Sequence, residues 1–249
     1  MRPARFLHCL AFLLLWSIAA LAQTAAMDST LVTRASQAFS AGRPVTSVEM
    51  TGRAKWTVGT IKDSGPAKLI ANVSGENKAE FDLSNGTRIE SQSALAEDRT
   101  CTWSGKDGVV HDVVPSNCWT AAIWFLPHLA IQGGTLPSVL RIQSADNTHI
   151  HHQVTLHASD AASSSSKNNA YSMIQQWSRT DLALDPETSL PSRLKYTIHP
   201  DNNSSIDIPV EVRYSNYKRV SDVELPMHIE RYVNGSLQLS IDIDSAVLN

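Results

Sequence analysis

The stretch SVEMTGRAKWTV, residues 47–58, alternates apolar and polar side chains along its whole length. Val48, Met50 and Trp56 fall on one parity, and Glu49 and Lys55 fall on the other. Successive side chains of a β-strand point to opposite faces of its sheet, so this alternation predicts a strand with one buried and one solvated face. A sheet made of such strands needs a cover for its apolar side.

The same alternation recurs along the rest of the chain. It is found in residues 67–73, 78–83, 193–198, 206–214 and 236–243. Asn85-Gly86 and Asn234-Gly235 each stand between two strand-like runs and supply the positive φ of a tight type I′ hairpin. Residues 105–108 and 185–191 predict two further turns. Strands with one wet face joined by short turns indicate an antiparallel sheet.

Helices are few in this sequence. The segment 28–42 begins with the capping residues Asp28 and Ser29, the segment 116–126 is ended or kinked by Pro127, and residues 168–178 form a third candidate. A twisted sheet of many strands tends to curl. We therefore predict a mainly β (α+β) fold, in which a strongly curved antiparallel sheet, or half-barrel, wraps around two or three short helices. Its concave side holds either a filled core or an apolar groove.

The N-terminal residues have the three parts of a secretory signal. Arg2 and Arg5 precede the apolar run 6–22, which ends in the small-residue site Ala20-Leu21-Ala22. We expect residues 1–22 to be a signal peptide and residues 23–249 to form one soluble domain that is periplasmic or extracellular. The alternative is an uncleaved anchor, for which the run is at the short limit. No later stretch is apolar enough to span a membrane.

Charge and cysteine usage limit the chemistry further. The chain has 24 acidic against 21 basic residues and no basic patch, which argues against nucleic acid as a partner. Cys101 and Cys118 remain after export, and an even number of cysteines in an oxidising compartment predicts a disulfide worth roughly 3 kcal/mol. The alternative is a reactive thiol at Cys118, at the start of a helix.

The C-terminal part of the chain, DPETSLPSRLKY followed by VEVRYSNYKRVSDVELPMHIERYVNGSLQLSIDIDSAVLN, resembles the C-terminal pattern of LolA-like proteins. The matching residues are Asp185, Thr188, Leu190, Pro191, Tyr214, Tyr217, Val220, Val223, Leu225 and Pro226. Asn216, Lys218 and Asp222 depart from the pattern, which has Asp, Arg and Gly there. The whole chain is similar to a family of secreted bacterial proteins. The motif consists of turn and strand residues, so it bears on the fold more than on the activity.

The resemblance implies an open, curved sheet around helices, of the kind that carries lipids or lipid-anchored proteins across the periplasm in an apolar cavity. We expect a non-catalytic protein that binds a lipid, an acyl chain or a lipidated partner on its concave sheet, without a cofactor. The candidate ligand contacts share the inner parity: Val48, Met50, Trp56, Phe81, Ile208, Val210, Met227 and Arg231. The alternatives are a protein-interaction module with a filled core, and a metal-dependent or serine hydrolase.

Arg231 breaks the apolar pattern of its strand. In ELPMHIERYV, residues 224–233, the parity of Leu225, Met227 and Ile229 places Arg231 on the inner face. A buried guanidinium needs a partner, so we expect it to snorkel out at the strand end. The alternative is a polar contact inside a ligand cavity.

The stretch THIHHQVTLH, residues 148–157, places His149, His151 and His157 on the wet face of an expected strand and His152 on its apolar face. A catalytic zinc site needs about three protein ligands with supporting residues, and no H-E-x-x-H motif is present. We expect a solvated polar face and no metal. The sequence also lacks a G-x-S-x-G elbow, a P-loop and a dinucleotide fingerprint. Asp242 and Asp244 share a strand face that we expect to be solvated.

Overall fold

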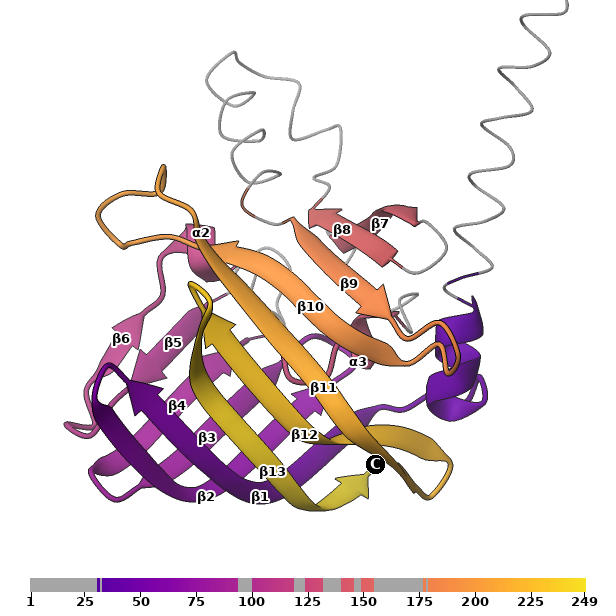
Figure 1. Cartoon of the computed structure of the whole chain (residues 1–249), viewed down its shortest axis with the longest axis horizontal. Coiled ribbons are helices and arrows are strands. Elements are labelled where there is room, and N and C mark those ends of the chain that lie inside the picture. The colour runs from indigo at the N-terminus through magenta and orange to yellow at the C-terminus, as the bar shows by residue number, and fades with distance from the viewer. Residues whose placement is uncertain are drawn as a thin grey trace, which may run out of the picture.

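The structure is a computed structural model that describes residues 31, 33–93, 100–118, 124–131, 140–145, 149–154, 177 and 179–249. These residues form one 13-stranded sheet in the order β6-β5-β4-β3-β2-β1-β13-β12-β11-β10-β9-β8-β7 (Figure 1). Each neighbouring pair is antiparallel. Each strand pairs with its neighbours in sequence, except that β6 and β7 lie at the two edges of the sheet, and the one non-sequential pair joins β1 to β13. The predicted fold class is confirmed.

The first wall of the sheet consists of β1 (Ser47–Val58), β2 (Ile61–Asn72), β3 (Asn77–Leu83), β4 (Gly86–Gln92), β5 (Cys101–Ser104) and β6 (Val110–Asp112). The second consists of β7 (Leu140–Ala145), β8 (His149–Val154), β9 (Thr180–Leu184), β10 (Pro191–Ile198), β11 (Ile208–Val220), β12 (Val223–Val233) and β13 (Ser236–Leu248). Short helices α2 (Pro115–Cys118) and α3 (His128–Ile131) follow the first wall, and residues 33–40 are helical ahead of β1.

The sheet curls until its two walls face each other, so that β12 and β13 pass in front of β3 and β4 in Figure 1. Two glycines permit this curvature. A Cβ at Gly52 would overlap the carbonyl oxygen of Asp242, and a Cβ at Gly65 would overlap that of Asp82. The β1–β13 register also shifts between Thr51 and Gly52. Close backbone approach and a bulge both increase the local bend of a strand.

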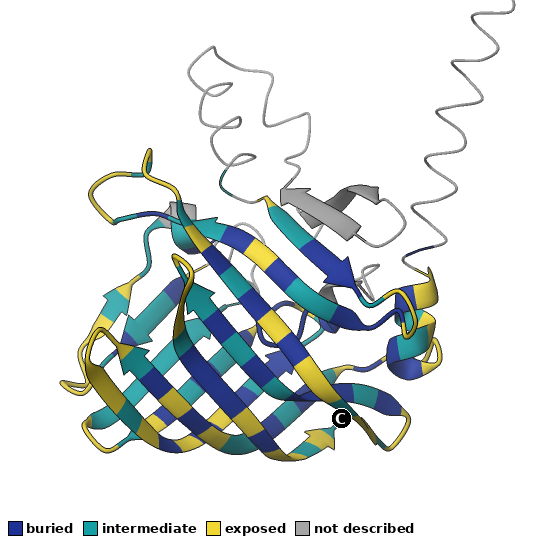
Figure 2. Cartoon of the chain, viewed as in Figure 1, coloured by how far each residue is buried: buried dark blue, intermediate teal, exposed yellow. Residues whose placement is uncertain are grey.

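Burial alternates along the strands as their sequences predict, with buried bands on the inner face (Figure 2). In β1 the side chains of Val48, Met50, Ala54 and Trp56 are buried. The pattern ends where the strand leaves the core, because Val58 is 51% exposed. The inner faces of β1–β3 and β10–β13 therefore form one apolar surface.

The helices and the loop after α2 cover this inner surface. Phe39 from the N-terminal helix, Phe125 and Leu126 from the loop, and Leu129 from α3 are fully or almost fully buried in the same core as the strands. The ring of Phe39 stacks on that of His128 with 4.3 Å between centroids. In the described residues the concave side is thus occupied by the protein's own side chains.

One predicted helix is wrong in extent. The helix predicted at residues 116–126 begins as α2, residues 119–123 lie outside the described residues, and Trp124 and Phe125 form a turn in place of the predicted helix. Pro127 disfavours a helical residue before it, and the carbonyl of Trp124 accepts a hydrogen bond from the Tyr214 hydroxyl instead of a helical N–H. The helix predicted within 28–42 is confirmed at residues 33–40. The one predicted at 168–178 lies outside the described residues except for Trp177, which is helical.

The two Asn-Gly hairpins differ in conformation. Asn234 and Gly235 have φ of 49° and 75°, as a type I′ turn requires, and Val233 pairs with Ser236 across them. Asn85 does not have a positive φ, so the type I′ prediction is wrong there, and only Gly86 does, at 119°. The Asp63 carboxylate accepts hydrogen bonds from the backbone N–H groups of Ser84 and Asn85 and fixes this turn from a neighbouring strand.

Candidate functional site

Charged and aromatic side chains meet on the inner face at one end of the curled sheet. We call them the arginine–tryptophan cluster: Trp56 of β1, Arg88 and Glu90 of β4, Trp103 of β5, Trp124 of the loop before α3 and Arg231 of β12. Each of the four strands contributes its residues near the same end of the sheet, where β1, β5 and β12 end and β4 begins. The cluster is therefore a product of the curvature.

Arg231 and Glu90 form an ion pair across the concave space. Arg231 Nη1 lies 2.9 Å from Glu90 Oε2, and its Nη2 lies 3.2 Å from Oε1. In the sheet, β12 and β4 are separated by β13, β1, β2 and β3. The pair can form only because the sheet curls. Arg231 is 7% exposed, so the prediction that it snorkels to solvent is wrong. Its partner lies on the opposite wall, where strand parity alone does not show it.

The charge state of the pair is fixed by the guanidinium groups around it. Burial by itself raises the pKa of Glu90, but the charge and hydrogen bonds of Arg231, and then of Arg88, outweigh it and lower this pKa to about 2. Glu90 is therefore ionised at neutral pH. Burial raises the pKa of nearby Tyr196 to about 12, so its phenol stays neutral. The cluster then holds two positive charges and one negative charge.

Arg88 lies between two aromatic rings. Its guanidinium carbon is 4.6 Å from the ring centroid of Trp56 and 5.3 Å from that of Trp103. Its Nε donates to Glu90 Oε1 at 3.2 Å, and no other hydrogen bond of this side chain is found among the described residues. Guanidinium groups stack favourably on indole rings. The stacking holds Arg88 in place and leaves its terminal nitrogens available.

A cavity of about 150 Å³ adjoins the cluster. Its lining residues are Asn77, Arg88, Glu90, Ser91, Gln92, Cys101, Thr102, Trp103, Val113, Asn117 and Trp124. The charged members of this lining are Arg88 and Glu90. Ligand pockets usually measure about 300–1,000 Å³, so this space suits a small group or one end of a larger molecule.

The residues predicted as ligand contacts lie together in the core. Val48, Met50, Phe81, Val210 and Met227 are buried in one continuous apolar cluster. Trp56 and Arg231 are buried and belong to the arginine–tryptophan cluster as well. Ile208 is only half-buried, at the first position of β11. Their role in binding remains a prediction.

The sequence did not mark the inner positions of β4. Arg88 and Glu90 pair with Phe81 and Ala79 of β3 and so share the inner face, whereas the apolar Ile89 lies on the other face. In this strand, the position of the apolar residue therefore gives the wrong prediction of which face points inward. The available signal was Arg231 itself, because an arginine on an inner face requires a carboxylate on another inner face.

The covering segment, Trp124–Ile131, contains an imperfectly satisfied residue. His128 is fully buried, and neither ring nitrogen has a hydrogen-bond partner among the residues that the structure describes. Burial lowers the pKa of His128 to about 3, so its ring is neutral at physiological pH. It packs between the rings of Phe39 and Tyr217. Buried polar atoms without partners are costly, so this segment is less tightly held than its burial implies.

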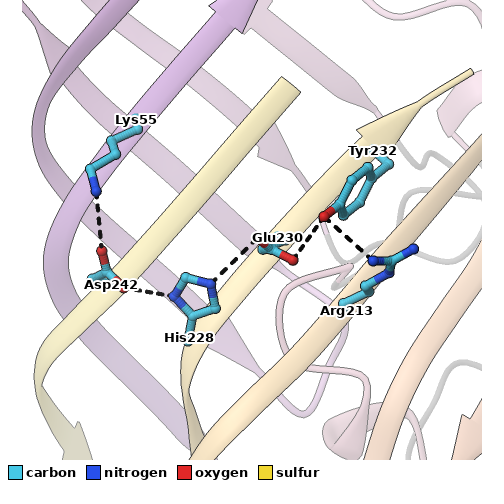
Figure 3. A network of polar contacts seen from close by, with 6 residues as sticks. All are labelled: Lys55, Arg213, His228, Glu230, Tyr232 and Asp242. Carbon is cyan, nitrogen blue, oxygen red and sulfur yellow. Dashed lines mark hydrogen bonds and ion pairs between the residues drawn. The ribbon is translucent and has the colours of Figure 1, made fainter. Parts of the chain in front are cut away.

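A second polar network lies on the outer face (Figure 3). His228 Nδ1 lies 2.6 Å from Asp242 Oδ1, and its Nε2 lies 3.7 Å from Glu230 Oε1. The Tyr232 hydroxyl donates to Glu230 at 3.0 Å, and the Lys55 amine lies 4.0 Å from Asp242. These side chains join β1, β13 and β12 on the exposed side. The network contains no serine or cysteine that the histidine could activate.

Part of the histidine-rich stretch forms a strand of the sheet. His149–Val154 forms β8, in which His151 pairs with Asp181 of β9, while His157 lies outside the described residues. Among the described residues, no group of three His, Cys, Asp or Glu side chains could hold a metal.

Cys101 and Cys118 are joined in a disulfide, as predicted, which ties α2 to β5 beside the cavity.

No protein-family model and no curated protein matches the chain. Among solved structures, a domain from Vibrio parahaemolyticus, provisionally described as an outer membrane lipoprotein-sorting protein, is 7% identical with a TM-score of 0.52, over 88% of this chain and 91% of that one. A DUF1329 family protein from Desulfovibrio piger is 10% identical with a TM-score of 0.52, over 89% and 92%. A LolA superfamily protein from Nitrosomonas europaea is 11% identical with a TM-score of 0.48, over 90% and 94%. At these identities the likeness concerns the fold.

Proposed function

We propose that this chain, whose fold is LolA-like, is an exported binding protein that takes a lipid, an acyl chain or a lipidated partner on the concave face of its sheet. Removal of residues 1–22 on export belongs to this proposal. Among the described residues, no helix is long and apolar enough to cross a membrane. The proposed role is carriage of an apolar group, without catalysis or a cofactor.

The observation that carries the proposal is the continuous apolar inner surface of the sheet. Long strands from both walls contribute to it, and small residues such as Ala54, Ala67, Ala71 and Ala79 keep it shallow. Burial of an acyl chain against such a surface is favourable by about 0.8 kcal/mol for each methylene. The solved structure from Vibrio parahaemolyticus, described as a lipoprotein-sorting protein, has the same fold.

Binding requires the covering segment to move. The cavity of about 150 Å³ is too small for a long acyl chain, and the rest of the inner surface is occupied by side chains such as Phe125 and Leu129. Within the described residues, both ring nitrogens of His128 in this segment lack a hydrogen-bond partner, which lowers the free-energy cost of moving the segment. One hydrogen bond holds the start of the segment closed, because the hydroxyl of Tyr214 donates to the carbonyl of Trp124. We propose that the ligand replaces residues 125–129, the part of the covering segment that follows Trp124, against the sheet, while Trp124 stays in the arginine–tryptophan cluster.

The test is native mass spectrometry of protein purified from its own periplasm, followed by lipid extraction and a fluorescent fatty-acid uptake assay. We expect a bound lipid-sized mass or saturable uptake by the delipidated protein. Lipid-free protein that takes up no fatty acid contradicts the proposal.

A variant pair ties the uptake to the covering segment. Tyr214→Phe removes the hydroxyl that holds Trp124 and weakens this closed arrangement by about 1 kcal/mol, so uptake rises about fivefold. Tyr232→Phe, which loses a hydroxyl from the outer network, leaves uptake unchanged. Equal uptake by both variants would show that the segment does not control access.

A further inference from the structure

The arginine–tryptophan cluster carries a surplus positive charge next to the cavity. Arg88 and Arg231 are both cationic, and Glu90 is the carboxylate that they share. Glu90 makes two hydrogen bonds to Arg231 and only one, at 3.2 Å, to Arg88. The carboxylate charge of Glu90 therefore mainly neutralises the buried Arg231, and the positive charge that is not neutralised lies on Arg88.

Arg88 is the member of the cluster that a ligand can reach. Its side chain is 32% exposed, against 9% for Arg231, and it lines the cavity. Its Nε is used by Glu90, while its terminal nitrogens have no hydrogen-bond partner among the described residues. The free edge of a guanidinium group binds a carboxylate or phosphate with two parallel hydrogen bonds.

The walls around Arg88 combine aromatic side chains with the polar side chains of Asn77, Ser91, Gln92, Thr102 and Asn117. Trp103 and Trp124 line the cavity together with Val113, and the guanidinium itself is stacked between Trp56 and Trp103. A charge in such surroundings is poorly hydrated, so pairing with an anion is worth more there than on an open surface. Arg88, which lines the cavity, also contacts Trp56, and the Trp56 ring centroid lies 5.7 Å from that of Phe81 in the apolar core of the sheet.

We propose that the cavity is the head-group subsite of the carrier, and that Arg88 pairs with the anionic head, a carboxylate or phosphate, of a ligand whose acyl tail lies on the concave sheet. This inference rests on the proposed function and adds its substrate class, an anionic amphiphile. The hydrogen bond from Arg88 Nε to Glu90, which is itself paired with Arg231, fixes the position of the Arg88 guanidinium group beside the cavity. The Trp56 and Trp103 rings fix the plane of its guanidinium group.

The experiment compares two probes with the same acyl chain, cis-parinaric acid and its uncharged methyl ester, in fluorescence titrations of the delipidated protein. A charge-assisted pair is worth about 1.5 kcal/mol or more, so the acid should bind about tenfold more tightly than the ester. Arg88→Gln should remove this preference by weakening the acid alone, and Arg88→Lys should restore part of it. The Glu90–Arg231 pair is intact in both variants, which keeps the sheet folded.

Arg219→Gln is the matched control, because Arg219 also donates through Nε to a glutamate, Glu224, but on an exposed surface. It should leave both affinities unchanged. Acid and ester that bind equally, or an acid affinity unaffected by Arg88→Gln, would overturn the head-group assignment while leaving the proposed function in place. Failure of both probes to bind would instead contradict the proposed function itself.

Inorganic phosphate provides the last comparison. If the subsite recognises the head of an acyl ligand, phosphate alone should displace the acid only weakly, because it brings no apolar surface to the sheet. Phosphate that competes as strongly as the acid would assign the cavity to a free anion and overturn the proposal.

Discussion

At the scale of single residues, the buried pair Arg231–Glu90 is the most consequential contact in the molecule. It joins two strands that are far apart in the sheet, with N–O distances of 2.9 and 3.2 Å. A buried charge without its partner is strongly unfavourable, whereas the desolvation of a complete pair cancels much of its attraction. The two single variants and the double variant should therefore behave very differently.

We expect Arg231→Met to lower the free energy of unfolding by about 3–5 kcal/mol, because it leaves the Glu90 carboxylate buried and only partly paired. Arg231→Met combined with Glu90→Leu should recover most of this loss. Urea denaturation with the disulfide intact measures both values. Arg219→Met at the exposed pair with Glu224 should cost no more than about 1 kcal/mol. Additive losses in the double variant would show that the pair does not act as a unit.

His128 gives the fold a pH dependence of its own. Its pKa falls from 6.5 to about 3 on folding because the ring is buried. Above pH 6.5 the ring is neutral in both states, so its full contribution is present. As the pH falls from 6.5 towards 3, the unfolded chain takes up a proton that the folded chain excludes, and stability decreases by up to about 1.4 kcal/mol per pH unit.

His128→Leu should remove this component. The leucine keeps an apolar contact with Phe39 and has no unsatisfied nitrogen, so the variant should be at least as stable as the parent at neutral pH. The difference in unfolding free energy between the two proteins should grow as the pH is lowered from 6.5. His111→Leu, at a half-buried histidine stacked on Trp103, serves as the control. A difference that is constant with pH would contradict the prediction.

At the scale of elements, the sequence predicted strands well and their inner polar residues poorly. The alternation in residues 47–58 predicts the buried side chains of β1 from Val48 to Trp56, because one face of that strand meets the core, and it fails only where the strand leaves the core at Val58. In β4 the inner face carries Arg88, Glu90 and Gln92, and the Arg231 partner of Glu90 comes from the opposite wall. Local alternation contains no information about the opposite wall, so Glu90 was not identified.

The same distinction explains the covering segment. The apolar residues around Trp124 suggested a continuous helix, but the structure uses them to fill the space between the walls, with the Trp124 carbonyl bound to Tyr214. The position of such a segment depends on the shape of the concave surface, which one sequence window does not contain. The hydrophobic residues were predictable, but their backbone conformation was not.

The glycine in β1 tests how the strands achieve their curvature. Gly52→Ala should lower the free energy of unfolding by about 3 kcal/mol, because the new Cβ overlaps the backbone of Asp242. Gly105→Ala is the control, since its Cβ would meet only ordinary contacts at 3.7 Å or more, and it should change stability by less than about 0.5 kcal/mol. Thermal or urea unfolding distinguishes the two. Equal effects would mean that β13 can shift to accommodate the methyl group.

At the scale of the whole molecule, the strand order places β13 in the middle of the sheet. It pairs with β1 on one side and β12 on the other, although it follows every other strand in sequence. Truncation after Gly235 should therefore abolish cooperative unfolding, because it removes a central strand and separates the two walls. Circular dichroism during thermal denaturation measures this. A truncated chain with a sharp transition would show that the first wall folds independently.

The pairing of β1 with β13, in which Val48 lies opposite Leu248, also governs the timing of assembly. Contacts between residues so distant in sequence form late, since loop closure must precede them. In the export proposed for this chain, β1 would have only β2 beside it during passage through a translocation channel, and its other edge would stay open until β13 emerges. The curled sheet could then not be completed while its last strand was still inside the channel.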